Sequence, residues 1–167
     1  MKKILVSTLL LSILLCGCSQ KQSDLMASNP YEIGVNGDVL SYYDDKSHFE
    51  SCGFEILNNA LKSTQSKRNN IFVNKDDHIR NIVVVDEDII TYKAISVGDD
   101  VNKILNNFEY ENSLGDNYSV LFDGTTEINS KDKSAKQDDF IWINYTTNDK
   151  TIEKITICDV LYGKEMR

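Results

Sequence analysis

Short segments of strand-type sequence outnumber helical ones in this chain of 167 residues, and they restrict the folds that it can adopt. The strongest is 78–86, in which Val83, Val84 and Val85 are consecutive β-branched residues that favour extended backbone. The same apolar or β-branched composition predicts strands at 70–74, 88–96, 118–122, 140–145 and 151–158. Such a chain is expected to build its core on a sheet.

Short turns between these segments favour antiparallel pairing. Asn36 and Gly37, in the middle of 31–43, tolerate the positive φ angles of a tight hairpin turn. The polar segment 146–150 is a plausible hairpin loop between the last two strands. Strands joined by so few residues lie side by side and run in opposite directions.

One segment has a clear helical repeat. Val101, Ile104, Leu105 and Phe108 recur at i, i+3, i+4 and i+7, which places them on one apolar face. Asp99 is expected to cap the free N–H groups of the first turn. We expect this apolar face of the helix to pack against a sheet.

Two weaker helical signals come earlier. Ser47 and Glu50 have the capping-box spacing, which predicts a single turn that ends at Gly53, and 58–70 reads as loop or a weak helix. The predicted fold is therefore α+β, an antiparallel sheet with one or two short helices packed on one face. We expect one globular domain over 31–167.

The N-terminal segment has the pattern of an export signal. Lys2 and Lys3 precede the apolar run 4–15, which is shorter than the roughly 20 residues that span a bilayer. The run ends in Leu-Cys-Gly-Cys, the spacing of a bacterial lipobox. We therefore predict a signal peptide at 1–17 and lipid modification of Cys18. An ordinary signal-peptidase cut and an uncleaved N-terminal helix are the alternatives.

The predicted mature chain is acidic. Residues 18–30 are polar and are expected to form a flexible tether between the lipid and the domain. Loss of 1–17 removes Lys2 and Lys3 and no acid, so the net charge of −8 becomes −10. This charge argues against nucleic acid as a partner and against electrostatic attraction to anionic lipid. It could attract cationic peptides or divalent ions, or it could be a solvated acidic surface.

The remaining cysteines and the two histidines are the candidates for thiol chemistry. Cys52 and Cys158 could form one disulfide in an exported protein, or each could be a buried free thiol. His48 and Cys52 are spaced i, i+4, as a nucleophilic dyad on a helix would be, but the helical segment there is short. His78 follows a predicted turn and is expected at the surface.

No other pattern typical of catalysis, metal binding or cofactor binding was found. The chain contains no Cys-x-x-Cys or His-x-x-x-His pair and no glycine-rich phosphate loop. The acidic clusters 86–88 and 138–139 could hold calcium weakly or be solvated turn residues. We therefore predict no catalytic residues, no metal ligands and no cofactor.

Aromatic residues are the remaining candidates for a binding face. The chain has one tryptophan, Trp142, which strand alternation points away from Ile141 and Ile143. The eight tyrosines could join it in a ligand-binding face or could pack in the core; they are Tyr31, Tyr42, Tyr43, Tyr92, Tyr110, Tyr118, Tyr145 and Tyr162.

Residues 90–100, ITYKAISVGDD, followed by Ile104, Leu105 and Phe108, resemble a unit of small exported lipoproteins of Gram-positive bacteria. A similar unit occurs in beta-lactamase-inhibitor-protein-like domains and in the small lipoprotein of the outer-membrane assembly machinery. The resemblance implies that Gly98-Asp99 is a strand-to-helix turn and that Phe108 closes the helix against the sheet.

The resemblance covers about half of the chain, and the chain departs from it at several positions. The usual glycines are replaced by Ala94 and Glu109, and the following proline is absent. Domains of this kind mostly bind other proteins, and no functional residue is carried over.

These patterns predict a lipid-anchored protein on the extracytoplasmic face of a bacterial cell membrane. Its expected role is that of a non-catalytic module that binds a protein or another ligand. An envelope-acting enzyme and a lipoprotein that binds small molecules or ions are the alternatives.

Overall fold

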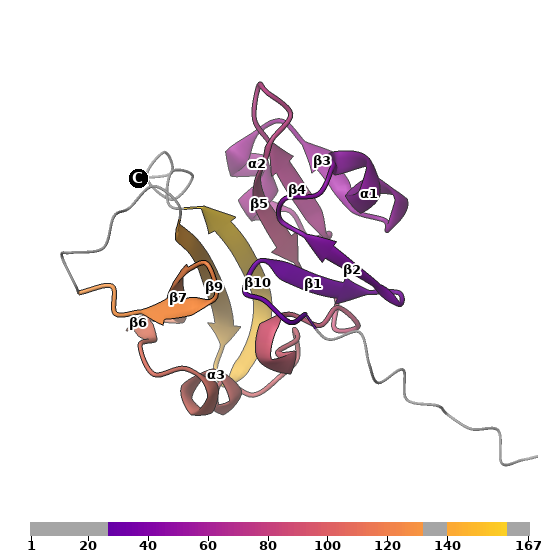
Figure 1. Cartoon of the computed structure of the whole chain (residues 1–167). Coiled ribbons are helices and arrows are strands. Elements are labelled where there is room, and N and C mark those ends of the chain that lie inside the picture. Colours follow the sequence, from indigo (N-terminus) through magenta and orange to yellow (C-terminus); the bar gives the residue numbers. More distant parts are fainter. Residues whose placement is uncertain (1–26, 132–139, 160–167) are drawn as a thin grey trace, which may run out of the picture.

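The computed structural model describes residues 27–131 and 140–159 (Figure 1). The predicted signal peptide 1–17, the predicted lipidation site Cys18 and most of the predicted tether lie outside the described residues. Ala27 and Pro30 are buried, and the backbone N–H groups of Ser28 and Asn29 donate to the Glu32 carboxylate. The folded domain therefore begins before the predicted start at residue 31.

Two sheets make up most of the fold. The smaller sheet is a hairpin of β1 (Glu32–Val35) and β2 (Asp38–Ser41), and Asn36 and Gly37 have the positive φ angles predicted for its turn. The larger sheet has the order β3-β4-β5-β10-β9-β7-β6, with β8 paired to β7. Its strands are β3 (Glu55–Leu57), β4 (Asn70–Val73), β5 (Ile79–Val84), β6 (Asn112–Leu114), β7 (Asn117–Asp123), β8 (Thr126–Ile128), β9 (Phe140–Asn148) and β10 (Thr151–Asp159).

The larger sheet is mixed, so the prediction of a purely antiparallel sheet was wrong. β3 and β4 pair in parallel, whereas every other pair of neighbouring strands described in this sheet is antiparallel. The reason is α2 (Ala60–Gln65), which returns the chain between the two strands, as a parallel connection requires. Asn59 caps α2 by accepting a hydrogen bond from the Lys62 N–H, so 58–70 contains the short helix that its sequence signalled only weakly.

The sheet has an inner and an outer face, which we define by the alternation and register of its strands. The inner face carries the large apolar side chains of the core, among them Ile71, Ile82, Ile143 and Ile157. The outer face carries Asn70, Asn81, Leu121, Trp142 and Cys158. Trp142 thus points away from Ile141 and Ile143, as predicted.

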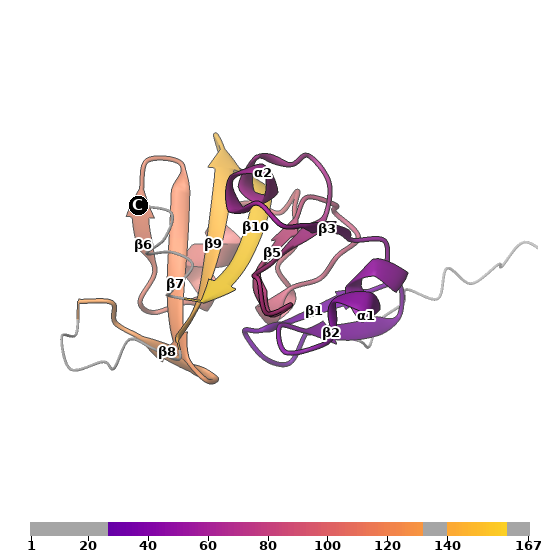
Figure 2. The same cartoon turned by 90° about the horizontal axis from the view of Figure 1, so that it is seen from above.

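Helices cover both faces, which corrects the expectation that they would share one. The β1–β2 hairpin, α1 (Lys46–Ser51) and α3 (Asn102–Asn107) supply Ile33, Phe49 and Ile104 to the inner core. α2 packs against the outer face, where the Ser63 hydroxyl bonds to Asn70 at 2.5 Å. Figure 2 shows α2 on one side of the sheet and β1, β2 and α1 on the other.

Aromatic rings fill the inner core beneath α3. Phe108 lies 6.0 Å from Phe122 and 6.2 Å from Tyr145, centroid to centroid. The Lys93 ammonium lies over the Phe108 ring, 4.5 Å from its centroid. Phe108 therefore closes α3 against the sheet.

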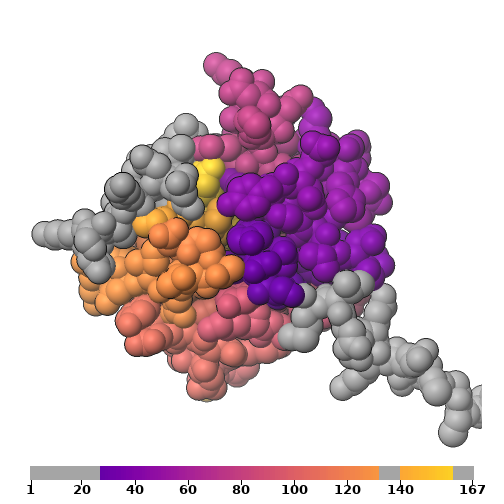
Figure 3. All heavy atoms as spheres, viewed as in Figure 1, coloured from indigo at the N-terminus to yellow at the C-terminus, as the bar shows by residue number. Residues whose placement is uncertain are grey.

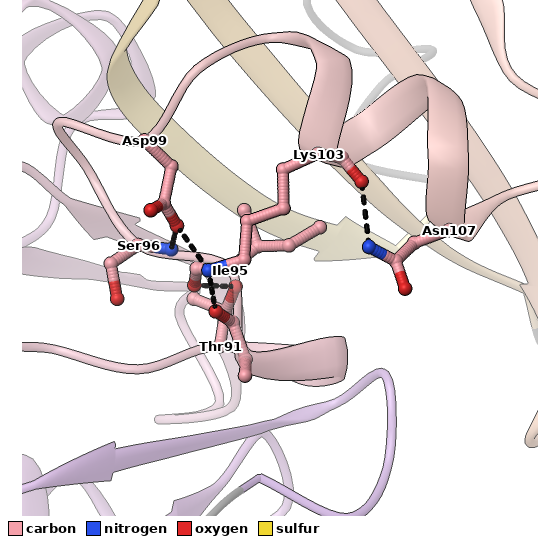
Figure 4. A network of polar contacts seen from close by, with 7 residues as sticks. Thr91, Ile95, Ser96, Asp99, Lys103 and Asn107 are labelled. Carbon is pink, nitrogen blue, oxygen red and sulfur yellow. Dashed lines mark hydrogen bonds and ion pairs between the residues drawn. The ribbon is translucent and has the colours of Figure 1, made fainter.

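The segment 88–96, predicted to be a strand, forms a compact turn instead. Tyr92–Ala94 is a 3-10 turn in which Lys93 and Ala94 have φ angles of 58° and 57°. The Thr91 hydroxyl donates to the Ile95 carbonyl at 2.6 Å (Figure 4). The Lys103 ammonium bonds to the Ala94 carbonyl. Left-handed backbone at two consecutive residues cannot continue a strand.

Neither predicted cap forms at its helix. The Asp99 carboxylate accepts from the Ser96 N–H at 2.7 Å and from the Lys103 ammonium at 2.8 Å, so it fastens the preceding loop (Figure 4). α1 begins after Asp45 with no side-chain cap, and Ser47, the predicted capping residue, lies inside the helix instead.

Candidate functional site

A cleft of about 560 Å³ opens at the end of the sheet where β10 ends and β5 and β9 begin. Antiparallel pairing brings these three strand ends together. The connection from β2 to α1 also contributes to the lining. The cleft is lined by Tyr42, Tyr43, Asp44, Asp45, Asp77, His78, Ile79, Arg80, Phe140, Ile141 and Asp159.

A half-buried ion pair forms one wall of the cleft. The Arg80 guanidinium lies 2.9 Å from the Asp159 carboxylate, with only 18% and 15% of the two side chains exposed. The Tyr42 hydroxyl donates to the same carboxylate oxygen at 3.0 Å. Ion pairs with so little exposure are screened far less than surface pairs, so this wall is held in one geometry.

Tyr42 is held in its neutral form. Burial raises the pKa of its hydroxyl well above the usual range, and the neighbouring Asp159 carboxylate raises that pKa further. Tyr42 therefore donates its hydrogen bond to Asp159 throughout the physiological pH range.

The cleft carries an excess of negative charge. Asp44, Asp45, Asp77 and Asp159 face a single guanidinium, that of Arg80. The Asp77 carboxylate also pairs with the Lys46 ammonium at 2.6 Å, outside the lining. Low-dielectric walls concentrate the field of such charges, so the cleft favours a cation.

Exposed aromatic surface lies at the mouth of the cleft. The Tyr43 side chain is 70% exposed, and its ring makes edge contacts with Tyr31 at 5.4 Å and Tyr42 at 5.6 Å. Tyrosine faces attract ammonium and guanidinium groups. The cleft thus combines carboxylates with aromatic rings, which suits a cation that also has an apolar part.

The His48 and Cys52 side chains do not line this cleft. The His48 ring lies 3.3 Å from the Asp44 carboxylate, and Cys52 follows α1 and packs against the inner core. His78 is exposed, as predicted, and does line the cleft. Neither residue of the His48–Cys52 dyad considered from the sequence therefore belongs to the cleft lining.

Cys52 and Cys158 are free thiols, so the disulfide considered from the sequence does not form. Cys52 packs on the inner core, whereas Cys158 is on the outer face, where the Asn144 amide lies 3.6 Å from its sulfur. The sheet separates the two side chains. Burial raises the pKa of the Cys158 thiol to about 12, and the Asp159 carboxylate adds to this effect.

The other candidate residues are dispersed. In the cluster 86–88, the Asp86 carboxylate accepts from the Asn69 amide, and the Glu87 side chain occupies the space that a Cβ on Gly98 would approach to 3.2 Å. Residues 138–139 and Tyr162 lie outside the described residues. Across the described ranges 27–131 and 140–159, no group of three or more potential ligands is placed to hold a metal ion.

Sequence reasoning missed Arg80 and Asp159, because each belongs to a strand and carries no motif. Their strand ends become neighbours only through the pairing of β5 with β10. The nearest signal in the sequence was the interruption of an apolar strand by a charged residue, at Arg80 in 79–84.

Comparison with protein-family models, curated proteins and solved structures found no significant match to this chain. Within the described residues, no helix has both the length and the apolar character needed to cross a bilayer. The functional assignment therefore depends on the cleft and on the sequence.

Proposed function

We propose that this protein is a lipid-anchored, non-catalytic binding module on the extracytoplasmic face of a bacterial membrane, and that its cleft holds a cationic ligand. The observation that carries the proposal is the cleft itself, in which three further carboxylates and the exposed Tyr43 surround the Arg80–Asp159 pair. The likeness of 90–108 to exported lipoproteins that mostly bind other proteins is consistent with a binding role.

The chemistry of the cleft supports binding without turnover. Its one buried phenol, Tyr42, is neutral and already bonded to Asp159, and the thiol of Cys52 is not part of the lining. A cationic peptide side chain would place its charge among the aspartates and its methylene groups on Tyr43. Long-range attraction by the acidic chain would add to the rate of association.

The lipid anchor is supported by the sequence around Cys18. Replacing Cys18 with Ser is expected to release the protein from the membrane fraction and to abolish incorporation of labelled palmitate, because the thiol is the attachment point. A single acyl chain binds a bilayer only marginally, and two or more hold a protein stably. Fractionation of cells that express each form measures the effect.

Cys16→Ser is the matched control, since it changes the neighbouring cysteine and should leave both readouts intact. Palmitate incorporation that survives Cys18→Ser would rule out the proposed anchor.

The cleft is tested with a hexalysine peptide. We expect hexalysine to bind the wild-type domain, and Asp45→Asn combined with Tyr43→Ala to weaken that binding about tenfold, because one carboxylate and one exposed ring are lost. Isothermal titration calorimetry at about 20 mM and about 200 mM salt measures the affinity and how far salt weakens it.

The control for charge alone is Asp116→Asn. Asp116 is exposed and is not part of the cleft lining, so this variant should bind hexalysine like the wild type. Equal weakening by Asp116→Asn, or unchanged binding by the double variant, would mean that hexalysine responds to net charge rather than to the cleft.

A further inference from the structure

A second hollow lies on the outer face of the sheet, over β6, β7 and β9. This groove has a volume of about 430 Å³. Its lining consists of Asn112, Ser113, Leu114, Asn117, Ser119, Val120, Leu121, Ser130, Trp142 and Asn144. β6, β7 and β9 lie side by side in Figure 2, and α2 covers the same face farther along, where Ser63 bonds to Asn81.

Strand register arranges the groove in rows across the sheet. Asn112 on β6, Ser119 on β7 and Asn144 on β9 are register partners and form one row. Leu121 and Trp142 form the next row, about 7 Å farther along the strands. The groove therefore presents a row of amide and hydroxyl groups beside a row of apolar surface.

No residue of the lining carries a charge. In the whole chain, 26% of the residues are charged, whereas none of the ten lining residues is. This surface therefore differs in composition from the chain as a whole. A charged ligand would lose its hydration here without gaining a partner of opposite charge. The groove is thus matched to a neutral ligand.

The polar groups of the groove can both donate and accept hydrogen bonds. Three amides and three hydroxyls line it, and each type supplies donors and acceptors. Within the described residues, the Ser119 hydroxyl makes no hydrogen bond, and the Asn144 amide nitrogen is engaged only by the Cys158 sulfur at 3.6 Å. Capacity therefore remains for a ligand with many hydroxyl groups.

Trp142 supplies the flat apolar surface of the groove. Its side chain packs against the outer-face cluster of Leu121 and Phe140 and also lines the groove. Its indole N–H is buried and has no hydrogen-bond partner in the described part of the chain. Aromatic rings of this kind offer a large contact area with little conformational entropy to lose.

From this combination we propose that the groove is a binding site for a neutral polysaccharide chain. A sugar ring has an apolar face of C–H groups, which Trp142 and Leu121 would contact. Its hydroxyls would exchange hydrogen bonds with the row of Asn112, Ser119 and Asn144. This site is separate from the cationic cleft, with which it shares no lining residue, and it does not depend on the function proposed for that cleft.

The only tryptophan of the chain makes the proposal directly measurable. Titration with chitohexaose, cellohexaose and maltohexaose should give a saturable change in Trp142 fluorescence with at least one of them, at or below about 1 mM. Polygalacturonate and a hexamer of glucosamine, which are charged, should bind at least about tenfold more weakly than the best neutral sugar.

Ser119→Asp tests the central row by placing a charge in it. We expect this variant to weaken binding of the best neutral sugar by at least about tenfold, because its carboxylate would have to be desolvated. Ser47→Asp is the matched control: it adds the same charge on an exposed turn of α1 and should bind the sugar like the wild type. Thermal unfolding of each variant shows whether the domain remains folded.

Two results would overturn the proposal. One is the absence of any fluorescence or calorimetric response to all three neutral hexasaccharides. The other is binding that Ser119→Asp and Ser47→Asp reduce equally in folded protein. Tyr43→Ala separates the two sites, since it should weaken hexalysine binding and leave sugar binding unchanged.

Discussion

Phe108→Ala is expected to lower the free energy of unfolding by about 3–5 kcal/mol, the range for removing a buried phenyl ring. Phe108 is only 6% exposed, and its ring contacts Tyr92, Phe122 and Tyr145. The substitution also removes the ring beneath the Lys93 ammonium. Urea unfolding of the two proteins, followed by circular dichroism, measures the difference.

Leu105→Ala is the matched control on the same helix. Leu105 is 42% exposed although the helical repeat placed it on the apolar face, so its loss should cost less than about 1 kcal/mol. A Phe108→Ala variant no less stable than Leu105→Ala would show that the aromatic cluster does not hold α3 on the sheet.

The second large effect is a loss of stability at alkaline pH. Three buried groups, Tyr42, Tyr145 and Cys158, have raised pKa values in the folded protein, chiefly because burial disfavours their charged forms. For Cys158 the pKa rises from 9.0 to about 12. The unfolded chain has ordinary values and therefore releases these protons first.

This difference makes the folded protein less stable as the pH rises. Above about pH 9 the unfolded state binds fewer protons than the folded state, so stability falls as the pH rises. Each such group contributes a loss of about 1.4 kcal/mol per pH unit between its unfolded and folded pKa values. Urea midpoints should therefore fall steeply between pH 10 and about pH 12, where all three groups contribute.

Variants distinguish the contribution of these three groups to the alkaline loss of stability from the contribution of lysines that titrate in the same pH range. Tyr145→Phe combined with Cys158→Ala removes two of the three protons and should make the alkaline decline shallower. The Tyr145 hydroxyl is buried and makes no hydrogen bond to the described residues, so Tyr145→Phe alone is not expected to destabilise the protein at pH 7. An unchanged alkaline slope in the double variant would contradict the assignment.

Local sequence signals predicted the regular parts of the fold. The β-branched run at 83–85 and the alternation in 140–145 mark strands β5 and β9, because packing against a sheet selects those side chains. The turn at Asn36-Gly37 also formed, since its chemistry is set by two residues alone.

What the sequence left open depends on contacts between distant residues. The parallel pairing of β3 with β4 requires α2, a six-residue helix too short to be stable alone. The turn at Tyr92–Ala94 replaced a predicted strand because tertiary contacts, such as that of Lys103 with the Ala94 carbonyl, override local propensity.

The two candidate sites illustrate the same limit. The cleft joins Tyr42, Arg80 and Asp159, which are far apart in the chain, and the groove joins partners on three strands. Neither has a local motif, because its geometry is set by strand register. Trp142 was identified as a candidate because alternation along one strand is a local property.

One face of the molecule brings together segments that are far apart in the sequence. In the space-filling view the β1–β2 hairpin, in indigo, lies at the middle of this face, between the later N-terminal segments and the orange strands of the other half (Figure 3). Residues from the start of the domain, among them Ile33 and Leu40, thus belong to the same buried core as the strands of the larger sheet.

The central position of β10 has a consequence for the order in which the sheet can be completed. Thr151–Asp159 is the last strand to be synthesised among those described, yet it lies between β5 and β9 and joins the two halves of the sheet. Before β10 is synthesised, β5 can pair only with β4 and β9 only with β7, so the two parts of the sheet cannot join. Under the export proposed above, a chain that completes its sheet this late would still lack its central strand while it is threaded through a translocation channel.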